Sequence, residues 1–162
     1  MGTLLKAENI SKEYVSGTFI KKRNLALKPV SFSIDDKTPS ITAIAGESGS
    51  GKTTFARVLA GILDKSSGVL RYKDKDLDYM SKDEELNFKK EVQTIFQDPF
   101  EVYNPFYKVD HVLTTPLKKF GMANSKSESD EMIISALKEV GLRPDETLGR
   151  YPHQLSGGQR QR

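Results

Sequence analysis

The sequence predicts an α/β fold, and three adjacent features of its first half carry this prediction. Residues 30–34 (VSFSI) alternate with the period of a half-buried strand. Residues 41–45 (ITAIA) form a short apolar run, typical of a buried strand, and a glycine-rich turn follows at once. Apolar residues then recur at the three- to four-residue spacing of one helix face: Phe55, Val58, Leu59, Ile62 and Leu63. This order predicts a strand, a turn and a helix in direct succession, and the helix should end among the turn-forming residues 64–68.

Size and composition fit about one domain and exclude several functional classes. The chain has 162 residues, of which 36% are hydrophobic and 29% charged. Lys and Arg outnumber Asp and Glu by 25 to 22, a surplus too small to indicate nucleic acid as a partner. The absence of cysteine excludes a disulfide scaffold, a thiolate nucleophile and a cysteine-ligated zinc site. No apolar stretch approaches the roughly 18–20 residues that span a bilayer, so we expect no direct membrane span.

A further strand is predicted before this unit, at residues 4–14. Residues 16–27 then follow and are expected to form a loop that carries three consecutive cations, Lys21-Lys22-Arg23. These cations either stay solvated or contact phosphate or an acidic partner.

The second half of the chain is predicted to be mainly helical. A strand at residues 69–72 and an amphipathic helix at 83–90 precede it. The next helix opens at Val109-Asp110 and ends at Gly121, and Pro116 should either kink it or delay its start. In the last predicted helix, Ser127-x-x-Asp130 resembles an N-terminal capping box, and Gly141 stands where a C-terminal cap belongs.

A phosphate-binding loop follows the strand predicted at residues 41–45. Residues 46–53 (GESGSGKT) fit the pattern G-x-x-x-x-G-K-[ST]. Glycines let backbone N–H groups converge on a polyphosphate, and the first helical turn adds unpaired N–H groups and the positive end of its dipole. We expect Lys52 to reach the β- and γ-phosphates, Thr53 to ligate Mg²⁺ and Thr54 to donate to the α-phosphate. The other residues expected to contact the nucleotide are Gly46, Glu47, Ser48, Gly49, Ser50 and Gly51.

Small GTPases, kinases and motor-like ATPases share such a loop, and the end of the chain distinguishes among them. Residues 155–159 (LSGGQ) match the signature sequence of ABC-type ATPases, which the chain resembles over essentially its whole length. Residues 95–99 (IFQDP) resemble the Q-loop of that family. The sequences of residues 97–105 and 150–153 are similar to those of ATP-binding subunits of oligopeptide, dipeptide and nickel importers.

The resemblance implies an incomplete P-loop NTPase of ABC type. Residues 1–97 would form an N-terminal β lobe and the phosphate-loop βα unit, and residues 98–162 a helical subdomain with the signature. In this family two domains pack head to tail, and each signature closes on the ATP of the other. The signature residues that would face the partner's ATP are Leu155, Ser156, Gly157, Gly158 and Gln159, with Ser156 and Gly158 at the γ-phosphate.

The chemistry of residues 155–159 also predicts an anion site without reference to the family. A serine followed by two glycines at a helix start offers a hydroxyl, bare N–H groups and a dipole, which together make a second anion site. The alternative is an N-capped surface helix with a glycine-rich entry.

Two further residues acquire roles from the resemblance, beside the catalytic Lys52. Gln97 would ligate Mg²⁺ or orient the attacking water, and its loop would receive the membrane subunit. Tyr14 matches the aromatic residue that stacks on adenine, although a tyrosine at a strand end serves equally well for packing. Neither His111 nor His153 falls where the catalytic histidine of the family lies, and we expect His153 to shape the signature loop through local contacts.

Two motifs of the family do not occur in the 162 residues. No run of four apolar residues is followed by Asp-Glu, and no switch histidine follows the signature. We therefore expect a truncated domain that alone hydrolyses ATP negligibly, because phosphoryl transfer needs a positioned water and metal. The strand that carries Asp-Glu should lie beside residues 41–45, so the chain is expected to be marginally stable, swapped or oligomeric.

Three functions stay open at this stage. The first is an ATP-binding subunit at the cytoplasmic face of the plasma membrane, which binds ATP and Mg²⁺, dimerises with a second ABC ATPase domain and drives transmembrane permease subunits that carry peptides or related solutes. Residues 97–107 are its expected permease contact. The second is a soluble ABC-type ATPase in DNA repair or on ribosomes, although the continuous run from phosphate loop to signature argues against the repair types. The third is a fragment that binds nucleotide without hydrolysis.

Overall fold

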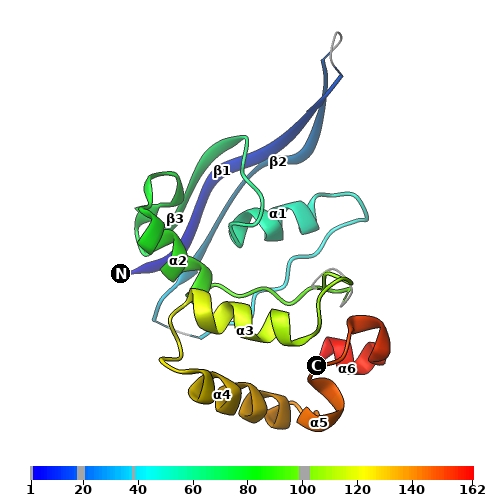
Figure 1. Cartoon of the computed structure of the whole chain (residues 1–162). Helices are drawn as coiled ribbons and strands as arrows, with labels where there is room; N and C mark the ends of the chain where they lie inside the picture. The colour runs from blue at the N-terminus through cyan, green and yellow to red at the C-terminus, as the bar shows by residue number, and fades with distance from the viewer. Residues whose placement is uncertain (1, 18–20, 38, 99–102) are drawn as a thin grey trace. The chain divides into compact units, whose positions relative to one another are not determined.

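The buried apolar side chains gather in two separate cores, and each core belongs to one unit of the chain. The units are Met1–Gln93 and Thr94–Arg162. The computed structural model describes residues 2–17, 21–37, 39–98 and 103–162 (Figure 1). The first core gathers around Ile10 and Val58, and the second around Ile133, Leu137 and Leu142.

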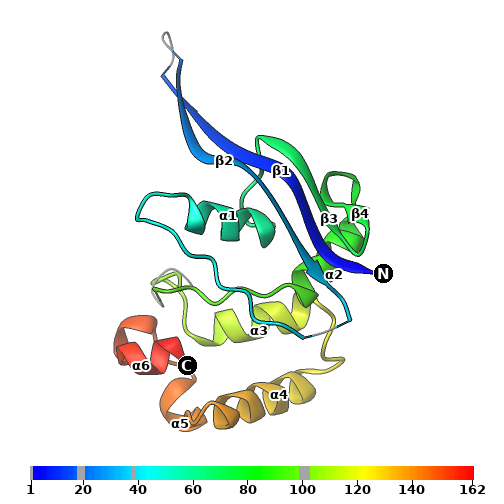
Figure 2. The same cartoon turned by 180° about the vertical axis from the view of Figure 1, so that it is seen from behind.

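The first unit is built on an antiparallel sheet with the strand order β2-β1-β3-β4 (Figures 1 and 2). β1 pairs with both β2 and β3, so it is the central long strand. The strands predicted at residues 4–14, 30–34 and 69–72 are confirmed. The observed bounds are Thr3–Ser16 for β1, Lys22–Asp35 for β2, Ser67–Tyr72 for β3 and Lys75–Asp76 for β4.

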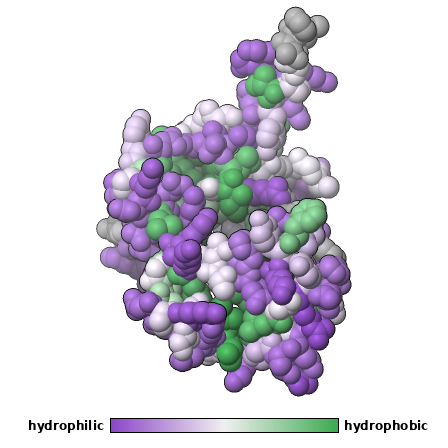
Figure 3. Space-filling view, viewed as in Figure 1, coloured by the Kyte–Doolittle hydropathy of each residue, from purple (hydrophilic) through white to green (hydrophobic). Residues whose placement is uncertain are grey.

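The loop expected at residues 16–27 is instead largely a two-stranded ribbon. β1 and β2 stay paired to their outer ends, whereas β3 accompanies β1 only as far as Ser11. The surface along this ribbon is mostly hydrophilic (Figure 3), and Arg23 lies 3.7 Å from Glu13 across the strand pair. Pairing satisfies backbone groups that a loop would leave to water, and cross-strand side chains support it. Residues 18–20 lie outside the described part of the chain.

Residues 41–45, predicted as a buried strand, are neither a strand nor buried. The segment has no regular secondary structure, the side chain of Ile41 is fully exposed and Ile44 is 44% exposed. A strand needs a neighbour for its backbone N–H and C=O groups. Among the described residues the sheet contains only β1 to β4, and none of these pairs with residues 41–45. The turn and the helix of the predicted βα unit are therefore present without its strand.

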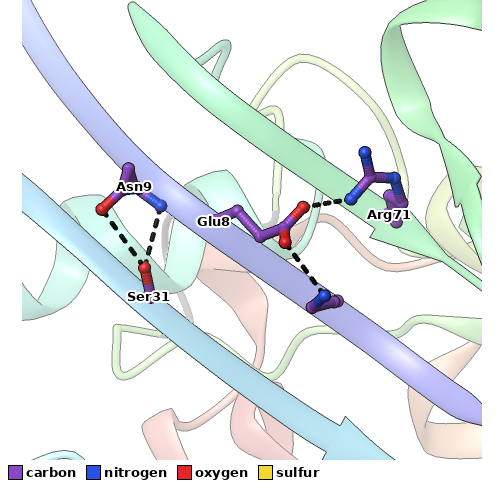
Figure 4. Close-up of polar contacts among 5 residues, drawn as sticks. Glu8, Asn9, Ser31 and Arg71 are labelled. Carbon is purple, nitrogen blue, oxygen red and sulfur yellow. Dashed lines mark hydrogen bonds and ion pairs between the residues drawn. The ribbon is translucent and has the colours of Figure 1, made fainter.

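A β-bulge at Asn9 keeps the apolar residues of β1 on the core side of the sheet. Asn9 has a φ of 50°, and the pairing register shifts there. Figure 4 shows the accompanying polar contacts: the Asn9 N–H donates to Ser31 Oγ at 3.0 Å, and Glu8 pairs with Arg71. Strict alternation would turn the last of three core residues outward, but the extra residue lets all of them be buried: Leu5, Ala7 and Ile10.

Helix α1 (Lys52–Leu59) packs against the sheet and begins where the sequence predicts. It ends before the predicted stop at residues 64–68. Gly61 adopts a left-handed φ of 66°, which ends the helix, and an added β-carbon there would lie 2.8 Å from the Phe88 ring. The buried face of α1 is formed by Phe55 and Val58.

Helix α2 (Lys82–Glu91) confirms the helix predicted around residues 83–90. Its N-cap is Ser81, whose hydroxyl accepts from the Glu84 N–H while the Glu84 carboxylate accepts from the Ser81 N–H. This reciprocal capping box satisfies two N–H groups at the start of the helix. A short 3₁₀ turn, η1 (Leu77–Tyr79), precedes α2.

The described part of the second unit is helical. α3 (Asp110–Lys119) and α4 (Lys126–Glu139) share an apolar core. Pro116 lies inside α3, which begins at Asp110, so this proline does not delay the start of the helix. Three shorter elements follow: α5 (Pro144–Thr147), η3 (Pro152–Gln154) and α6 (Gly157–Gln161).

The N-cap of α4 is Ser125 and not Ser127 as predicted. Ser125 Oγ accepts from the Glu128 N–H at 3.1 Å, and the Ser125 backbone is extended, as an N-cap requires. Ser127 lies in the first helical turn, where its hydroxyl is 3.4 Å from Glu131. The C-terminal prediction is confirmed, because Gly141 (φ 71°) follows the last turn and its N–H donates back to the helix.

Candidate functional site

The loop that precedes α1 is shaped by two glycines with left-handed backbone. Gly49 has a φ of 79° and Gly51 a φ of 94°, conformations that other residues rarely adopt. The Ser50 N–H donates to the Glu47 carbonyl at 3.2 Å, which closes a tight turn. Residues 46–50, including Ser48, are exposed. The loop is therefore curled and open to solvent, as a phosphate-binding loop must be.

Gly51 seats this loop on strand β2. A β-carbon on Gly51 would approach the carbonyl oxygen of Ala26 and the side chain of Leu27. Leu27 is itself buried in the first core, so it fixes the position of the loop's end. The contact that positions the loop therefore comes from β2, and the sequence pattern of the loop does not predict it.

The Lys52 side chain folds back over the loop. Its ammonium donates to the carbonyl oxygens of Gly46 at 2.6 Å and Glu47 at 2.7 Å. An ammonium has three N–H donors. Two of them can be used in these bonds, which fix the charge over the loop.

The N-terminus of α1 supplies further positive potential. Its N-cap, Gly51, provides no side-chain cap, and the first turn contains no acidic residue. The first N–H groups of a helix lack intrahelical partners, so those of Lys52, Thr53 and Thr54 can donate to a ligand. The Thr53 side chain is exposed and Thr54 is half-buried. This combination of cation, dipole and N–H donors suits a polyphosphate.

The loop forms one wall of an open pocket of about 580 Å³. The opposite wall comes from β2 and includes the apolar Leu25 and the cationic Lys28. Sequence analysis did not assign these β2 residues to the site. In the sequence, these residues stand out only because the charged Lys28 follows the apolar Leu27 on a strand. Many strands with one solvent-exposed face have this pattern, so it does not indicate a binding site.

Tyr14 is not among the described residues that line this pocket. It lies on β1, where it is 46% exposed, and the Lys12 ammonium is 5.4 Å from its ring centroid. The ring is therefore partly exposed and partly covered.

The signature segment (residues 155–159) begins helix α6, as the sequence predicts. Ser156 is the N-cap: its hydroxyl accepts from the Gln159 N–H at 3.2 Å, and the Gln159 side chain accepts from the Ser156 N–H at 2.9 Å. Leu155 is buried. Among the described residues, nothing lies within 4 Å of a β-carbon added to Gly157 or Gly158. The fold of the chain therefore does not require these glycines, which leave bare backbone at the surface.

Gln97 lies in an exposed bend of the second unit, whereas Lys52 belongs to the first. Pro99, the last residue of the Q-loop resemblance, lies outside the described residues, as do residues 100–102. His153 makes a local contact, because its ring stacks on Tyr151 with centroids 5.7 Å apart. This agrees with a role in shaping the segment before the signature.

The described residues contain no group of three or more His, Asp or Glu side chains placed to hold a metal. Thr53 offers an exposed neutral hydroxyl at the start of α1, a donor of the kind that Mg²⁺ accepts beside phosphate oxygens and water. Within the same described ranges, no helix is both long and apolar enough to cross a membrane.

Many NTPases share a loop of this geometry, and comparison with known families distinguishes among them. The family model for the ABC transporter matches residues 27–162. The chain belongs to the ABC transporter family. The match includes both the phosphate loop and the signature segment, and the antiparallel sheet with its helices forms an incomplete ABC-type P-loop NTPase fold.

Curated relatives of this ABC chain are ATP-binding proteins of transport systems. The chain is 37% identical over 165 residues to the di/tripeptide transport ATP-binding protein DppF of Pseudomonas aeruginosa, covering 100% of this chain and 50% of the relative. It is 41% identical over 143 residues to the oligopeptide transport ATP-binding protein OppF of Streptococcus pyogenes serotype M1 (88% and 46%). The resemblance to peptide-transport subunits is thus confirmed. The chain spans about half the length of the curated relatives it matches.

Solved ABC structures are similar to the chain in fold. One is the ATP-binding cassette MJ0796, solved as a dimer in a post-hydrolysis state bound to ADP and Pi. Its TM-score is 0.73 at 25% identity, and the match covers 96% of this chain and 65% of that one. For cbiO1 from Clostridium perfringens, part of the ABC transporter complex cbiONQ, the TM-score is 0.66 at 27% identity, with 99% of this chain and 59% of that one covered.

Proposed function

We propose that the protein is the ATP-binding subunit of an ABC transporter that couples ATP binding and hydrolysis to the import of peptides or related solutes. The observation that carries this proposal is the curled loop of residues 46–52, where two carbonyls hold the Lys52 ammonium beside the acid-free start of α1. Lys52 neutralises the β- and γ-phosphates of ATP, and Thr54 donates to the α-phosphate. The N–H groups of the loop complete the contacts.

Thr53 and Gln97 are the proposed protein ligands of Mg²⁺. Both offer neutral oxygen atoms on exposed side chains, of the kind that Mg²⁺ accepts with phosphate oxygens and water. Gln97 has the alternative task of orienting the attacking water. Bound Mg²⁺ neutralises charge that develops on the transferred phosphoryl group.

Tyr14 is proposed to stack on the adenine ring. The partial exposure of its side chain on β1 supports this role. Residues 1–97 would then form the half that binds nucleotide, and residues 98–162 the half that carries the signature.

Residues 155–159 are proposed to close on ATP held by a second ABC ATPase domain packed head to tail. The open space in front of Gly157 and Gly158 supports this role, because glycine weakens a helix by up to about 1 kcal/mol relative to alanine. Close approach of a partner to the exposed backbone would explain why glycine stands at these two positions. Ser156 would meet the γ-phosphate through its hydroxyl.

Transmembrane permease subunits are the second proposed partner. Residues 97–107 supply the contact, and two aromatic side chains there are well exposed, Phe106 at 85% and Tyr107 at 51%. This arrangement would place the protein peripherally at the cytoplasmic face of the plasma membrane, with no role in binding nucleic acid. Co-expression with neighbouring permeases should yield a complex, and its consistent absence would contradict the proposal.

The cargo is the least constrained part of the proposal. SapF of Salmonella typhimurium is named a peptide transport protein and SapF of Escherichia coli a putrescine export protein, yet each is 36% identical to this chain over 166 residues. Membrane and receptor subunits choose the solute. A soluble ABC-type ATPase is the remaining alternative, and failure to associate with any permease would favour it.

Residues 1–162 by themselves are proposed to bind ATP without appreciable hydrolysis. They contain no apolar run followed by Asp-Glu, the pair that positions metal and water in the resembled family. Robust Mg²⁺-dependent phosphate release by the pure chain would refute this statement. Phosphate release is measured beside nucleotide binding, so that an unfolded sample is recognised.

Lys52→Ala is the central test of nucleotide binding. The variant should weaken the binding of a fluorescent ATP analogue at least tenfold, because it removes the cation that the carbonyls of Gly46 and Glu47 hold over the loop. Lys126→Ala is the matched control, since Lys126 is the first residue of α4 as Lys52 is of α1. Equal affinity of the two variants would overturn the assignment of the loop.

A further inference from the structure

The signature helix α6 cannot hold its position by itself. It contains five residues, Gly157–Gln161, and begins with two glycines. Isolated helices shorter than about 12 residues are marginal in water, and glycine is among the poorest helix formers. The orientation of Ser156 and the two glycines must therefore be set by contacts with the rest of the second unit.

Contacts that anchor this helix include the following three. The side chain of Leu155 is buried immediately before the N-cap, with 4% exposed. Arg162 Nη1 lies 3.4 Å from the Gly141 carbonyl, to which it donates, beyond the end of α4. The Tyr103 hydroxyl donates to the Arg160 carbonyl at 3.3 Å. The first two anchors belong to the signature region itself, whereas Tyr103 comes from 57 residues earlier in the chain.

The Tyr103 hydroxyl makes its bond to the Arg160 carbonyl in partly buried surroundings. Tyr103 is half-buried, and burial raises the pKa of its hydroxyl. A tyrosine hydroxyl is protonated at neutral pH even with its ordinary pKa of about 10, so this group can donate. Tyr107, four residues later, is exposed and stacks its ring on His111 with centroids 4.4 Å apart. The two tyrosines of this segment therefore serve different purposes.

We infer that Tyr103 is a positioning residue for the signature site, because its hydroxyl holds α6 in the orientation that presents Ser156, Gly157 and Gly158. This inference rests on the proposed function, which gives the signature its task. Tyr103 acts through α6 and does not touch nucleotide. Loss of the bond lets α6 sample other orientations, which weakens capture of the partner's ATP without changing how the phosphate loop binds its own.

Tyr103→Phe tests the contact directly, because it removes the hydroxyl and keeps the ring. Amide exchange, followed by NMR on residues 1–162, should accelerate about two- to tenfold at Gln159, Arg160 and Arg162, whose N–H groups are bonded within the capped helix. Amides of α4 should exchange at unchanged rates. Tyr107→Phe is the control and should alter neither set. Unchanged exchange in α6, or equal acceleration throughout the second unit, would overturn the inference.

The functional consequence is measured on the complete protein. Tyr103→Phe should weaken the ATP-dependent association of two copies by a similar factor, while the affinity of the phosphate loop for a fluorescent ATP analogue stays unchanged. Loss of both properties together, or of neither, would contradict a positioning role. A wild-type protein that shows no ATP-dependent association would count against the proposed head-to-tail dimer, and the exchange experiment would still decide whether Tyr103 anchors α6.

Discussion

A β-carbon on Gly51 would lie 2.7 Å from the backbone carbonyl oxygen of Ala26, closer than real β-carbons approach an atom. The phosphate loop is therefore seated on β2 by direct backbone contact. Gly49, two residues earlier, has an equally left-handed backbone, but no described atom lies within 4 Å of its would-be β-carbon. An alanine at Gly49 would therefore suffer only backbone strain, whereas an alanine at Gly51 would suffer both backbone strain and steric crowding.

Gly51→Ala should lower the free energy of unfolding far more than Gly49→Ala. Left-handed backbone alone costs an alanine roughly 1–2 kcal/mol, and overpacking adds about 1–3 kcal/mol at Gly51 only. Urea unfolding should show this order, and binding of a fluorescent ATP analogue should be lost in Gly51→Ala and weakened less in Gly49→Ala. Equal destabilisation of the two variants would show that the seat on β2 is loose.

Ser125→Ala should destabilise the chain by about 1 kcal/mol, because it removes the N-cap of α4. Ser127→Ala is the matched control within the same sequence pattern, and its expected effect is within roughly 0.5 kcal/mol, as for other surface substitutions. Thermal or urea unfolding of both variants measures the difference. The reverse order would restore Ser127 as the cap that the sequence pattern favours.

Glu84 should carry an acid-sensitive part of the stability. The Lys75 ammonium, followed by the backbone and hydroxyl of Ser81, lowers the pKa of Glu84 from 4.5 to about 2. Because the folded-state pKa lies below the unfolded value, the stabilisation is complete above about pH 4.5 and is lost as the pH falls through about 2. The difference in urea midpoint between wild type and Glu84→Gln should therefore be largest near neutral pH and disappear at about pH 2.

Asp83→Asn provides the control for this titration. It removes one negative charge from the same helical turn and leaves the capping box of Ser81 and Glu84 in place. Its difference from wild type should not follow the same pH window. A Glu84→Gln difference that stays constant down to pH 2 would show that the pair with Lys75 does not stabilise the fold.

The phosphate loop and the start of α6 could be predicted because their signals are local. Residues 46–53 contain the glycines, the cation and the helix start within eight positions, and Ser156 caps α6 through residues that follow it directly. The roles of these residues toward ATP stay predictions. Leu25 and Lys28 could not be assigned to the pocket, since only the fold of β2 brings them to the loop.

The incorrect predictions concern features that depend on distant neighbours or on competing local choices. Residues 41–45 have the composition of a buried strand, but composition does not supply a pairing partner. Gly61 ends α1 where it approaches Phe88, a residue well outside the window that suggested a longer helix. Ser125 and Ser127 begin equivalent patterns, and only the backbone conformation selects between them.

The exposed residues 41–45 have a consequence for how the chain behaves while it is handled. An apolar run without a strand beside it, such as the one that contains Ile41 and Ile44, is the kind of segment that promotes aggregation and attracts chaperones. The proposed nucleotide site begins at the next residue, Gly46. A ligand that binds only the folded form at a hundred times its Kd stabilises that form by about 2.7 kcal/mol. Nucleotide in the purification buffer should therefore act as a folding ligand and keep the protein dispersed.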